Sequence, residues 1–182
     1  MTTLLEDMLA VAVADSKTAD KGGGELLVPV LEGMSIRRVM PRRDERGRVT
    51  EIYDRRWSWH DGPIDYVYQT TIQPGFAKGW NLHMTHEDRY FVTSGDMALI
   101  TFDPREHSST FGMVSRVVLS ASEPCVVNVP KFVWHADHNI GTTEVVIVSF
   151  PTLPYDHDNP DKYRLPLDTP FIPYDFHGAK GW

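Results

Sequence analysis

The apolar and polar positions of this chain follow a helical period at first and the period of β-strands afterwards. Residues 3–15 predict a short helix, and Thr2 or Thr3 is placed to cap its first turn. The polar, glycine-rich stretch 15–24 predicts a flexible linker. The expected division is therefore an N-terminal helix and linker, residues 1–25, and one β domain with a proline-rich C-terminal tail, residues 26–182.

Beyond the linker, strand-like stretches recur about every ten residues and are separated by glycine and proline. This spacing is typical of an all-β sandwich or barrel of antiparallel strands. No long helical pattern interrupts the series, which disfavours a parallel α/β fold. The prolines that follow residue 150 predict an extended tail that wraps the barrel. The expected strands are residues 35–40, 49–53, 65–73, 78–84, 88–94, 97–103, 113–119, 125–129, 132–138 and 143–150.

Composition adds limits to this picture without changing it. With 182 residues, 41% of them hydrophobic, the chain is long enough for one domain with a real core. No apolar run is long enough to cross a bilayer, and no signal peptide is visible. The formal net charge of −7 argues against nucleic acid as a partner. The lone Cys125 leaves no disulfide framework, so the expected location is cytoplasmic.

Arginine is concentrated in one short region, because eight of the twelve arginines fall between residues 37 and 56. Guanidinium groups bind phosphate oxygens in pairs, which makes the region a candidate for holding an anionic small molecule. The alternative is a solvated strand edge that its charge protects from aggregation. Taken alone, the run favours the solvated edge.

Two histidine-bearing segments supply the candidate chemistry. In regular strand geometry Asn81 and His83 share one face, and Lys78 points to the other. Glu87 follows after a turn, and His135 arrives from a later strand. Imidazole and carboxylate groups that converge on one point can hold a metal ion. A metal site made of His83, Glu87 and His135 is therefore one hypothesis.

The spacing of these segments is similar to that of two known signature motifs. Pro130, His135 and Asn139 fit the second motif of the cupin superfamily, with Phe132 in place of the usual glycine. The first motif matches in part, because Asn81 stands where metal-binding cupins carry a histidine. The resemblance implies a small jelly-roll barrel with a polar pocket inside, and the asparagine counts against a metal in it.

The flanks of the histidine segments carry a narrower resemblance. Its most specific part is Asp103-x-Arg105-x-x-Ser108-Ser-Thr-Phe-Gly112, and it extends over about residues 26–176. The chain in this way resembles the dTDP-4-dehydrorhamnose 3,5-epimerase family, whose members are jelly-roll cupins that usually dispense with metal. The other matching segments, in chain order, are Asp44-Glu-Arg-Gly47 with Glu51, Gln69 before Gly75, Lys78-Gly79 leading to His83, Leu119-Ser120, Val129-Pro130, Trp134-His135 and Thr152-x-x-Tyr155.

The resemblance implies a proton-transfer reaction and roles for particular residues. In that family a histidine oriented by an aspartate removes a proton next to the C4 ketone of a nucleotide-linked sugar, and a tyrosine on the opposite face returns one. A ketone acidifies its neighbouring C–H bond, and positioned donors stabilise the enolate that forms. Carried across by position, His83 is the base and Asp168 its orienting carboxylate. The implied contacts to the nucleotide, its phosphates or the sugar come from Arg46, Glu51, Gln69 and Lys78.

Departures from the family pattern leave two roles open. The lysine that supports the enolate is missing, and Arg89 is the nearest replacement. The strand that should carry the acid tyrosine, residues 145–150, has none. Tyr155 is the candidate substitute, with simple packing beside the tail as the slightly preferred alternative. Trp134 and its neighbour His135 are expected to line the pocket.

The expectation is therefore a cupin enzyme that acts as an epimerase-like isomerase on a dTDP-linked 4-keto-6-deoxy sugar. It needs no cofactor, has no nucleic acid or membrane partner, and forms a homodimer in which residues 35–56 complete the partner's sheet. Two alternatives stay open. One is a metal-dependent isomerase or oxygenase that uses His83, Glu87 and His135, and the other is a barrel that binds a sugar nucleotide without turning it over.

Overall fold

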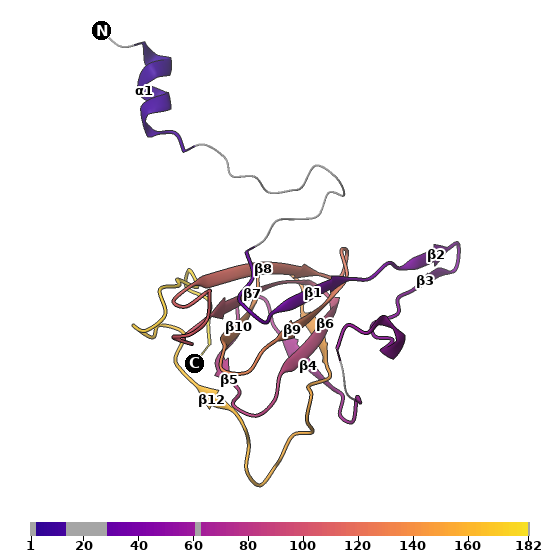
Figure 1. Ribbon diagram of the computed structural model, residues 1–182. Coiled ribbons are helices and arrows are strands. Elements are labelled where there is room, and N and C mark those ends of the chain that lie inside the picture. Colours follow the sequence, from indigo (N-terminus) through magenta and orange to yellow (C-terminus); the bar gives the residue numbers. More distant parts are fainter. Residues whose placement is uncertain (1–2, 14–28, 61–62, 182) are drawn as a thin grey trace.

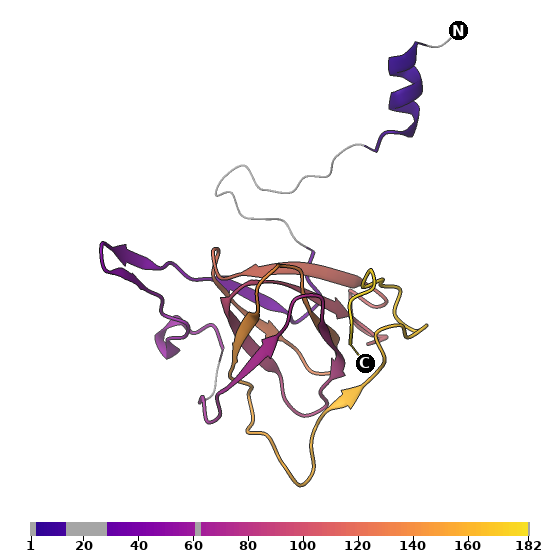
Figure 2. The same cartoon turned by 180° about the vertical axis from the view of Figure 1, so that it is seen from behind.

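Two β-sheets packed face to face form the body of the molecule. A computed structural model describes residues 3–13, 29–60 and 63–181. One sheet has the strand order β1-β9-β6-β11-β4 and the other β12-β5-β10-β7-β8, with antiparallel pairing throughout (Figures 1 and 2). The strands are β1 Ser35–Arg38, β2 Arg42–Asp44, β3 Gly47–Val49, β4 Tyr68–Ile72, β5 Ala77–Leu82, β6 Asp88–Ser94, β7 Asp96–Phe102, β8 Val114–Ser120, β9 Cys125–Val129, β10 Trp134–Asn139, β11 Val145–Ser149 and β12 Tyr163–Arg164.

Most neighbouring strands are far apart in the sequence, as in a jelly roll. In the two large sheets as described, β7 and β8 are the only neighbours that follow one another along the chain. Apart from β7 and β8, successive strands from β4 to β12 therefore lie in opposite sheets, and the other strand pairs of the two sheets join segments far apart in the sequence. The predicted all-β, antiparallel class is confirmed.

The main core lies between the sheets and is built from the inward positions of both. Because side chains alternate along a strand, Val92 of β6 and Leu99 of β7 point inward and meet in this core. The buried apolar residues of the core are Leu31, Met34, Ile72, Tyr90, Val92, Met97, Leu99, Val117, Leu119, Val127, Val129, Val133, Val145 and Ile147.

Both sheets are also covered on their outer faces, by two different parts of the chain. The C-terminal tail packs Ile172 and Phe176 over the buried Trp80 of β5, so the predicted wrapping of the tail is confirmed. On the other sheet, apolar residues of 52–59 together with Ile64 pack over Phe91 and Val126. This double covering explains why β6 and β7 are buried along most of their length and do not alternate between apolar and polar.

Strand β5 is irregular, and this irregularity decides which of its residues face inward. His135 of β10 pairs with Asn81, but Asp137 pairs with Lys78, so two residues of β5, at positions 79 and 80, oppose the single residue 136 of β10. Lys78 and Asn81 consequently line the same cavity. The prediction that Lys78 and Asn81 face opposite sides of a regular strand is wrong for this reason.

A hairpin of β2 and β3 forms an arm that projects from the barrel (Figures 1 and 2). All six of its strand residues are exposed, and Met40 and Val49 expose 84% and 69% of their surface. A short 3-10 helix, η1 Arg55–Trp57, follows the arm. The arginine-rich region is thus largely a solvated extension, with strands at 42–44 and 47–49 where 49–53 was predicted.

The N-terminal helix is shorter than predicted. Helix α1 covers Leu4–Val11 and begins with a capping box, in which Thr3 accepts a hydrogen bond from the Glu6 N–H. None of its residues is buried. The linker predicted for residues 15–24 lies outside the described residues. No helix in the described part of the chain is long and apolar enough to cross a membrane.

Candidate functional site

A cavity of about 630 Å³ lies at one end of the space between the sheets. Strands of both sheets contribute polar side chains to its wall, so a ligand there would meet fixed donors and acceptors on a rigid scaffold. The ionisable and amide groups from β5, β6 and β10 are Lys78, Asn81, Asp88, Tyr90, His135 and Asp137.

A buried carboxylate on β6 stands at the centre of this wall. Asp88 Oδ2 lies 3.1 Å from His83 Nε2 and 3.3 Å from His135 Nε2. His86 Nε2 approaches the other oxygen, Oδ1, at 3.7 Å. Asp88, His83 and His135 are no more than 9% exposed. Three imidazole rings from two separate segments therefore surround one carboxylate.

The charges of this cluster support one another. Burial by itself would lower the pKa of His83, but the hydrogen bond and the charge of Asp88 outweigh burial and raise that pKa. Burial also opposes the ionisation of Asp88, yet hydrogen bonds from the three histidines hold its pKa well below the usual range. Asp88 therefore stabilises a proton on His83, as a carboxylate paired with a general base should.

The segment that leads into β12 contacts the two histidines from the other side. The Asp161 carbonyl accepts a hydrogen bond from His83 Nδ1, and the Asp161 carboxylate lies 2.9 Å from His86 Nδ1. The same carboxylate accepts hydrogen bonds from the N–H groups of Met84 and Thr85, at 2.9 and 2.8 Å. Burial opposes this charge, but these contacts hold the pKa of Asp161 well below its usual range.

A second cavity of about 310 Å³ adjoins the first. His83 and His86 line it, together with the 151–157 part of the loop between β11 and β12. Tyr68, Lys162 and Arg164 line both cavities and therefore lie where the two spaces meet. The His83–Asp88 pair also links them, because Asp88 borders the first cavity and His83 the second.

A second buried acid faces the first cavity from β10. The Tyr90 hydroxyl donates a hydrogen bond to Asp137 Oδ1 at 3.2 Å. Burial raises the pKa of Asp137, and burial together with the nearby carboxylates raises the pKa of Tyr90. Both groups therefore favour their protonated forms more than the same groups in water.

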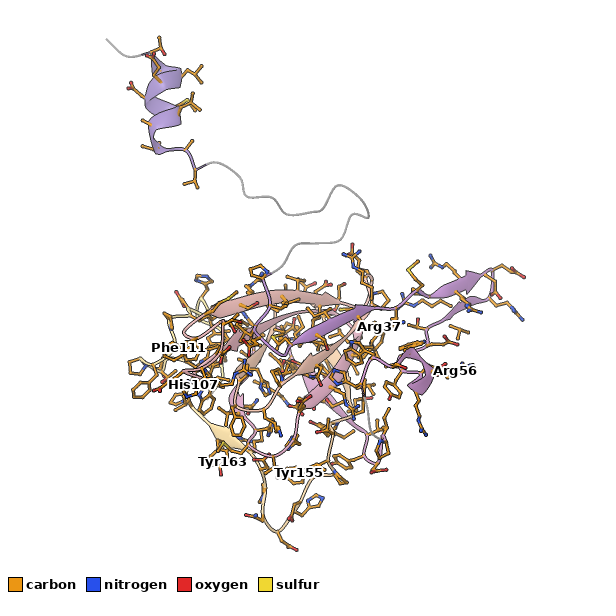
Figure 3. The ribbon with its side chains drawn as sticks, in the orientation of Figure 1. Arg37, Arg56, His107, Phe111, Tyr155 and Tyr163 are labelled. Atoms are coloured by element: carbon orange, nitrogen blue, oxygen red, sulfur yellow. The ribbon has the colours of Figure 1, made fainter. Side chains whose placement is uncertain are left out.

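Four of the residues chosen from sequence lie at these cavities. Lys78 and His135 line the larger cavity, and His83 and Tyr155 line the smaller one. Figure 3 shows Tyr155 on the loop between β11 and β12, well away from His107 and Phe111. The structure thus brings the expected base and the candidate acid to one place.

The carboxylates chosen from sequence lie elsewhere. Asp168 is exposed on a turn after β12, and the carboxylate that contacts His83 is Asp88. Glu87 accepts a hydrogen bond from Asn128 Nδ2 at 2.9 Å and is not part of the histidine cluster. The hypothetical metal set of His83, Glu87 and His135 is corrected accordingly, with Asp88 in place of Glu87.

Strand alternation places three further candidates on the outer faces. Arg89 follows the inward Asp88, is 1% exposed, and donates to the carbonyl oxygens of Phe150 and Pro151. Trp134 precedes the inward His135 and packs in the cluster beneath the C-terminal tail. Gln69 lies between Tyr68 and Thr70, both of which line the larger cavity, and is exposed.

The two candidates from the arginine-rich region are also remote from this cavity in the chain itself. Arg46 is at the turn of the arm, where its guanidinium pairs with Asp44 at 2.5 Å and is 83% exposed. Glu51 follows β3 and is exposed. Contacts from Arg46 and Glu51 to a substrate would therefore require the cavity of a second copy.

Sequence reasoning missed most of the groups that complete the site. Asp88 could have been found from strand 88–94, because it shares a face with the apolar residues at 90 and 92. Lys162 precedes β12 and Arg164 belongs to it, and no pattern in the proline-rich tail predicted this two-residue strand. Asp161 contacts His86, which lies 75 residues earlier in the chain, and a single sequence gives no signal for such a long-range contact.

Comparison with known proteins agrees with this architecture. The chain is 27% identical over 142 residues to the probable low-salt glycan biosynthesis epimerase Agl13 of Haloferax volcanii, which covers 78% of this chain and 91% of the relative. It is 27% identical over 150 residues to the spore coat polysaccharide biosynthesis protein SpsL of Bacillus subtilis, with 81% and 97% covered.

The fold is shared with a solved structure. The dTDP sugar isomerase from Desulfovibrio desulfuricans G20 superposes with a TM-score of 0.76 at 24% identity, over 86% of this chain and 98% of that one. The cupin-type jelly roll that the motifs predicted is thereby confirmed. A family described as the polysaccharide biosynthesis C-terminal domain matches residues 42–163, from the start of β2 to the start of β12. Since that match takes in most of the barrel and both histidine segments, the chain belongs to this polysaccharide biosynthesis family.

Proposed function

We propose that this protein is an epimerase-like isomerase of a nucleotide-linked 4-keto-6-deoxy sugar, and that it acts by proton transfer next to the ketone. The observation that carries the proposal is the buried His83–Asp88 pair between two joined cavities. The names of the relatives, a glycan biosynthesis epimerase and a dTDP sugar isomerase, favour the same chemistry.

His83 is the base in this proposal, and Asp88 takes the role that the resemblance gave to Asp168. The C–H bond beside the ketone breaks, its proton moves to His83, and its electron pair forms the enolate with the ketone oxygen. Asp88 stabilises the imidazolium of His83. The raised pKa of His83 lets this residue compete for the proton near neutral pH. His135, 3.3 Å from the same carboxylate oxygen, faces the substrate space.

Three cations are placed to hold the anionic part of the substrate. Lys78, Lys162 and Arg164 all line the larger cavity, and the latter two also line the smaller one. Burial and the neighbouring Arg164 lower the pKa of Lys162, a crowding of positive charge that a bound diphosphate would relieve. Lys78, Lys162 and Arg164 therefore replace Arg46, to which the resemblance assigned a contact with the nucleotide or its phosphates.

We assign the return of the proton to Tyr68, with Tyr155 as the competing assignment. Tyr68 lines both cavities, and burial raises the pKa of its hydroxyl, so it keeps its proton at neutral pH. Tyr155 lines only the smaller cavity, and the two tyrosines are similarly exposed, at 37% for Tyr68 and 41% for Tyr155. We expect Tyr68→Phe to lower the rate of epimerisation by about 10²-fold or more, and Tyr155→Phe to lower it less. The reverse order of effects would give the role to Tyr155.

The decisive experiment is proton NMR in deuterated water with dTDP-4-keto-6-deoxyglucose. Wild type should exchange the C3 or C5 hydrogen of the substrate, and His83→Ala should abolish the exchange. His107→Ala is the matched control, because this histidine is exposed and far from Tyr155 (Figure 3). Full exchange by His83→Ala would remove His83 as the base. Tight dTDP binding without exchange by wild type would indicate a binding protein.

A homodimer and a cytoplasmic location are further parts of the proposal. The exposed arm with Met40 and Val49 supports a dimer, because exposed apolar side chains on a projecting hairpin suit a contact with a second copy. Arg46 and Glu51 would then approach the partner's cavity. The cytoplasmic location rests on the lone Cys125 alone.

Metal-dependent chemistry is the second candidate, because one observation favours it. Ligand atoms of His83, Asp88 and His135 all lie within 4.8 Å of one another, and Asp88 Oδ1 is buried without a hydrogen-bond partner. Two imidazoles and one carboxylate suit zinc, iron or manganese. Elemental analysis of purified protein tests it: one equivalent of metal, lost in His135→Ala together with a lower Tm, would support this candidate, and metal-free protein with wild-type exchange activity would end it.

A further inference from the structure

We propose that Asp161 is a positioning residue that fixes the rings of both His83 and His86 and ties them to the 151–162 loop. The catalytic consequence rests on the proposed function, whereas the positioning itself rests on hydrogen bonds. Neither the resemblance nor the set of cavity-lining residues includes Asp161. Its side chain points toward residues 84–86 between β5 and β6, called the histidine turn below, and not toward the substrate space.

The carboxylate of Asp161 organises the turn that carries the histidines. Its Oδ2 accepts hydrogen bonds from the Thr85 hydroxyl at 2.6 Å and from the Thr85 and His86 N–H groups at 2.8 and 3.3 Å. Its Oδ1 accepts from the Met84 N–H at 2.9 Å. Donors from three successive residues thus converge on one side chain, which holds the backbone between β5 and β6 in a single shape.

The same residue decides which nitrogen of each ring carries hydrogen. A backbone carbonyl and an ionised carboxylate can only accept hydrogen bonds. His83 Nδ1 faces the Asp161 carbonyl and His86 Nδ1 faces its carboxylate, so both Nδ1 atoms must be donors. The Nε2 atoms are left for Asp88, at 3.1 and 3.7 Å. Asp88 is ionised and likewise only accepts, so His83 Nε2 also carries hydrogen in this arrangement and must release it before the ring can act as a base.

The loop between β11 and β12 is fastened to the site through this residue. Pro151, Leu153 and Tyr155 from the loop line the smaller cavity, and Asp161 ends the loop against the histidine turn. The two rings lie 4.0 Å apart between their centroids, so a shift of one reaches the other. A substrate that moves the loop would change the orientation of the base through Asp161.

Two measurements, NMR of the imidazole rings and the deuterium exchange assay, test the positioning. Long-range ¹H–¹⁵N NMR of the imidazoles should show Nδ1–H for His83 and His86 in wild type. Asp161→Ala should abolish this signature for His86. In the deuterium exchange assay the same variant should lose about 10²-fold in kcat with little change in KM, because the base is misplaced while the substrate contacts remain.

Matched variants keep the test decisive if Asp161→Ala folds poorly. Thr85→Val removes one of the donors and should give a smaller loss in kcat with the Nδ1–H signals retained. Asp158→Ala, exposed on the same loop, should match wild type in both readouts. Unchanged tautomers in Asp161→Ala would overturn the proposal, even if wild type shows no exchange. Altered tautomers with wild-type kcat would overturn the catalytic part.

Discussion

At the scale of single residues, Asp103 shows how a buried charge is kept in this barrel. Its carboxylate is fully buried and accepts five hydrogen bonds: from the Arg105 backbone, from two guanidinium nitrogens of Arg105, and from the hydroxyls of Ser108 and Thr110. Burial opposes the charge, but these donors hold the pKa of Asp103 well below its usual range. The motif that carried the family resemblance is therefore a hydrogen-bonded cluster around Asp103 that closes the loop after β7.

Loss of this charge should destabilise the protein. We expect Asp103→Asn to cost about 3 kcal/mol in the free energy of unfolding, because charged donors are left without their acceptor. Urea denaturation at pH 6 measures the difference, and Asp158→Asn should differ from wild type by less than about 0.5 kcal/mol. Equal urea midpoints for wild type and Asp103→Asn would contradict the stabilising role of the hydrogen-bonded cluster around Asp103.

The pH dependence of this difference has a definite sign. The folded pKa of Asp103 is lowered, so its contribution is complete above the unfolded pKa of about 3.9 and disappears as the pH falls through the folded value. The gap between wild type and Asp103→Asn should therefore narrow below about pH 4. A gap that widens on acidification would refute the assignment.

Residue identity alone gave part of the site, and the missing part has a physical cause. His83, His135 and Lys78 could be chosen because their types and spacing suit the chemistry. The choice between Glu87 and Asp88 depended on which one begins strand β6, a difference of a single residue. The spacing of the histidine segment alone led to Glu87, whereas alternation along the predicted strand 88–94 places Asp88 on the inward face.

At the scale of elements, strand β5 depends on one glycine. An added Cβ on Gly79 would lie 2.6 Å from the Ala136 Cα on β10 and 3.0 Å from the His135 carbonyl oxygen. Backbone atoms of a central strand cannot move aside easily, so only glycine fits there. The close approach lets β5 and β10 shift register and turns Lys78 and Asn81 into the same cavity.

Gly79→Ala should therefore destabilise the barrel by about 1–3 kcal/mol. Thermal unfolding checks this expectation. Gly141→Ala is the matched control, because its nearest neighbours would be 3.6 Å or farther from the new Cβ, and its Tm should stay close to that of wild type. A similar Tm for all three proteins would show that β5 adapts to the methyl group.

The elements themselves were predictable to different degrees. Nine of the ten expected strands overlap an observed strand in the two large sheets, because alternation and the intervening turns mark them locally. The exception, 49–53, leads away from the arm, and β12 was missed because two residues carry no pattern of their own. Pairing partners were not predictable, since they depend on contacts between distant strands.

At the scale of the whole molecule, the strands of the arm contribute no buried residue to the core of their own barrel. Val39 before it and Ile52 after it pack in the apolar cluster on the outer face of one sheet, whereas residues 42–49 are exposed. Replacement of 42–49 by a short Gly-Ser turn should leave the barrel folded. If the arm makes the proposed dimer, light scattering should give twice 20.7 kDa for wild type and about half that mass for the variant. Wild type that elutes as a monomer would contradict the dimer.

The strand order described above also governs when the molecule can fold during synthesis. Strand β1 must wait for β9, β4 for β11 and β5 for β12, so one sheet is complete only after residue 149 has left the ribosome and the other only after residue 164. At about 5–20 residues per second, the early strands spend several seconds with unpaired edges. The charged arginines near β1 and the arm are then as useful to the nascent chain as to the finished protein, because charge on an open edge discourages pairing with other chains.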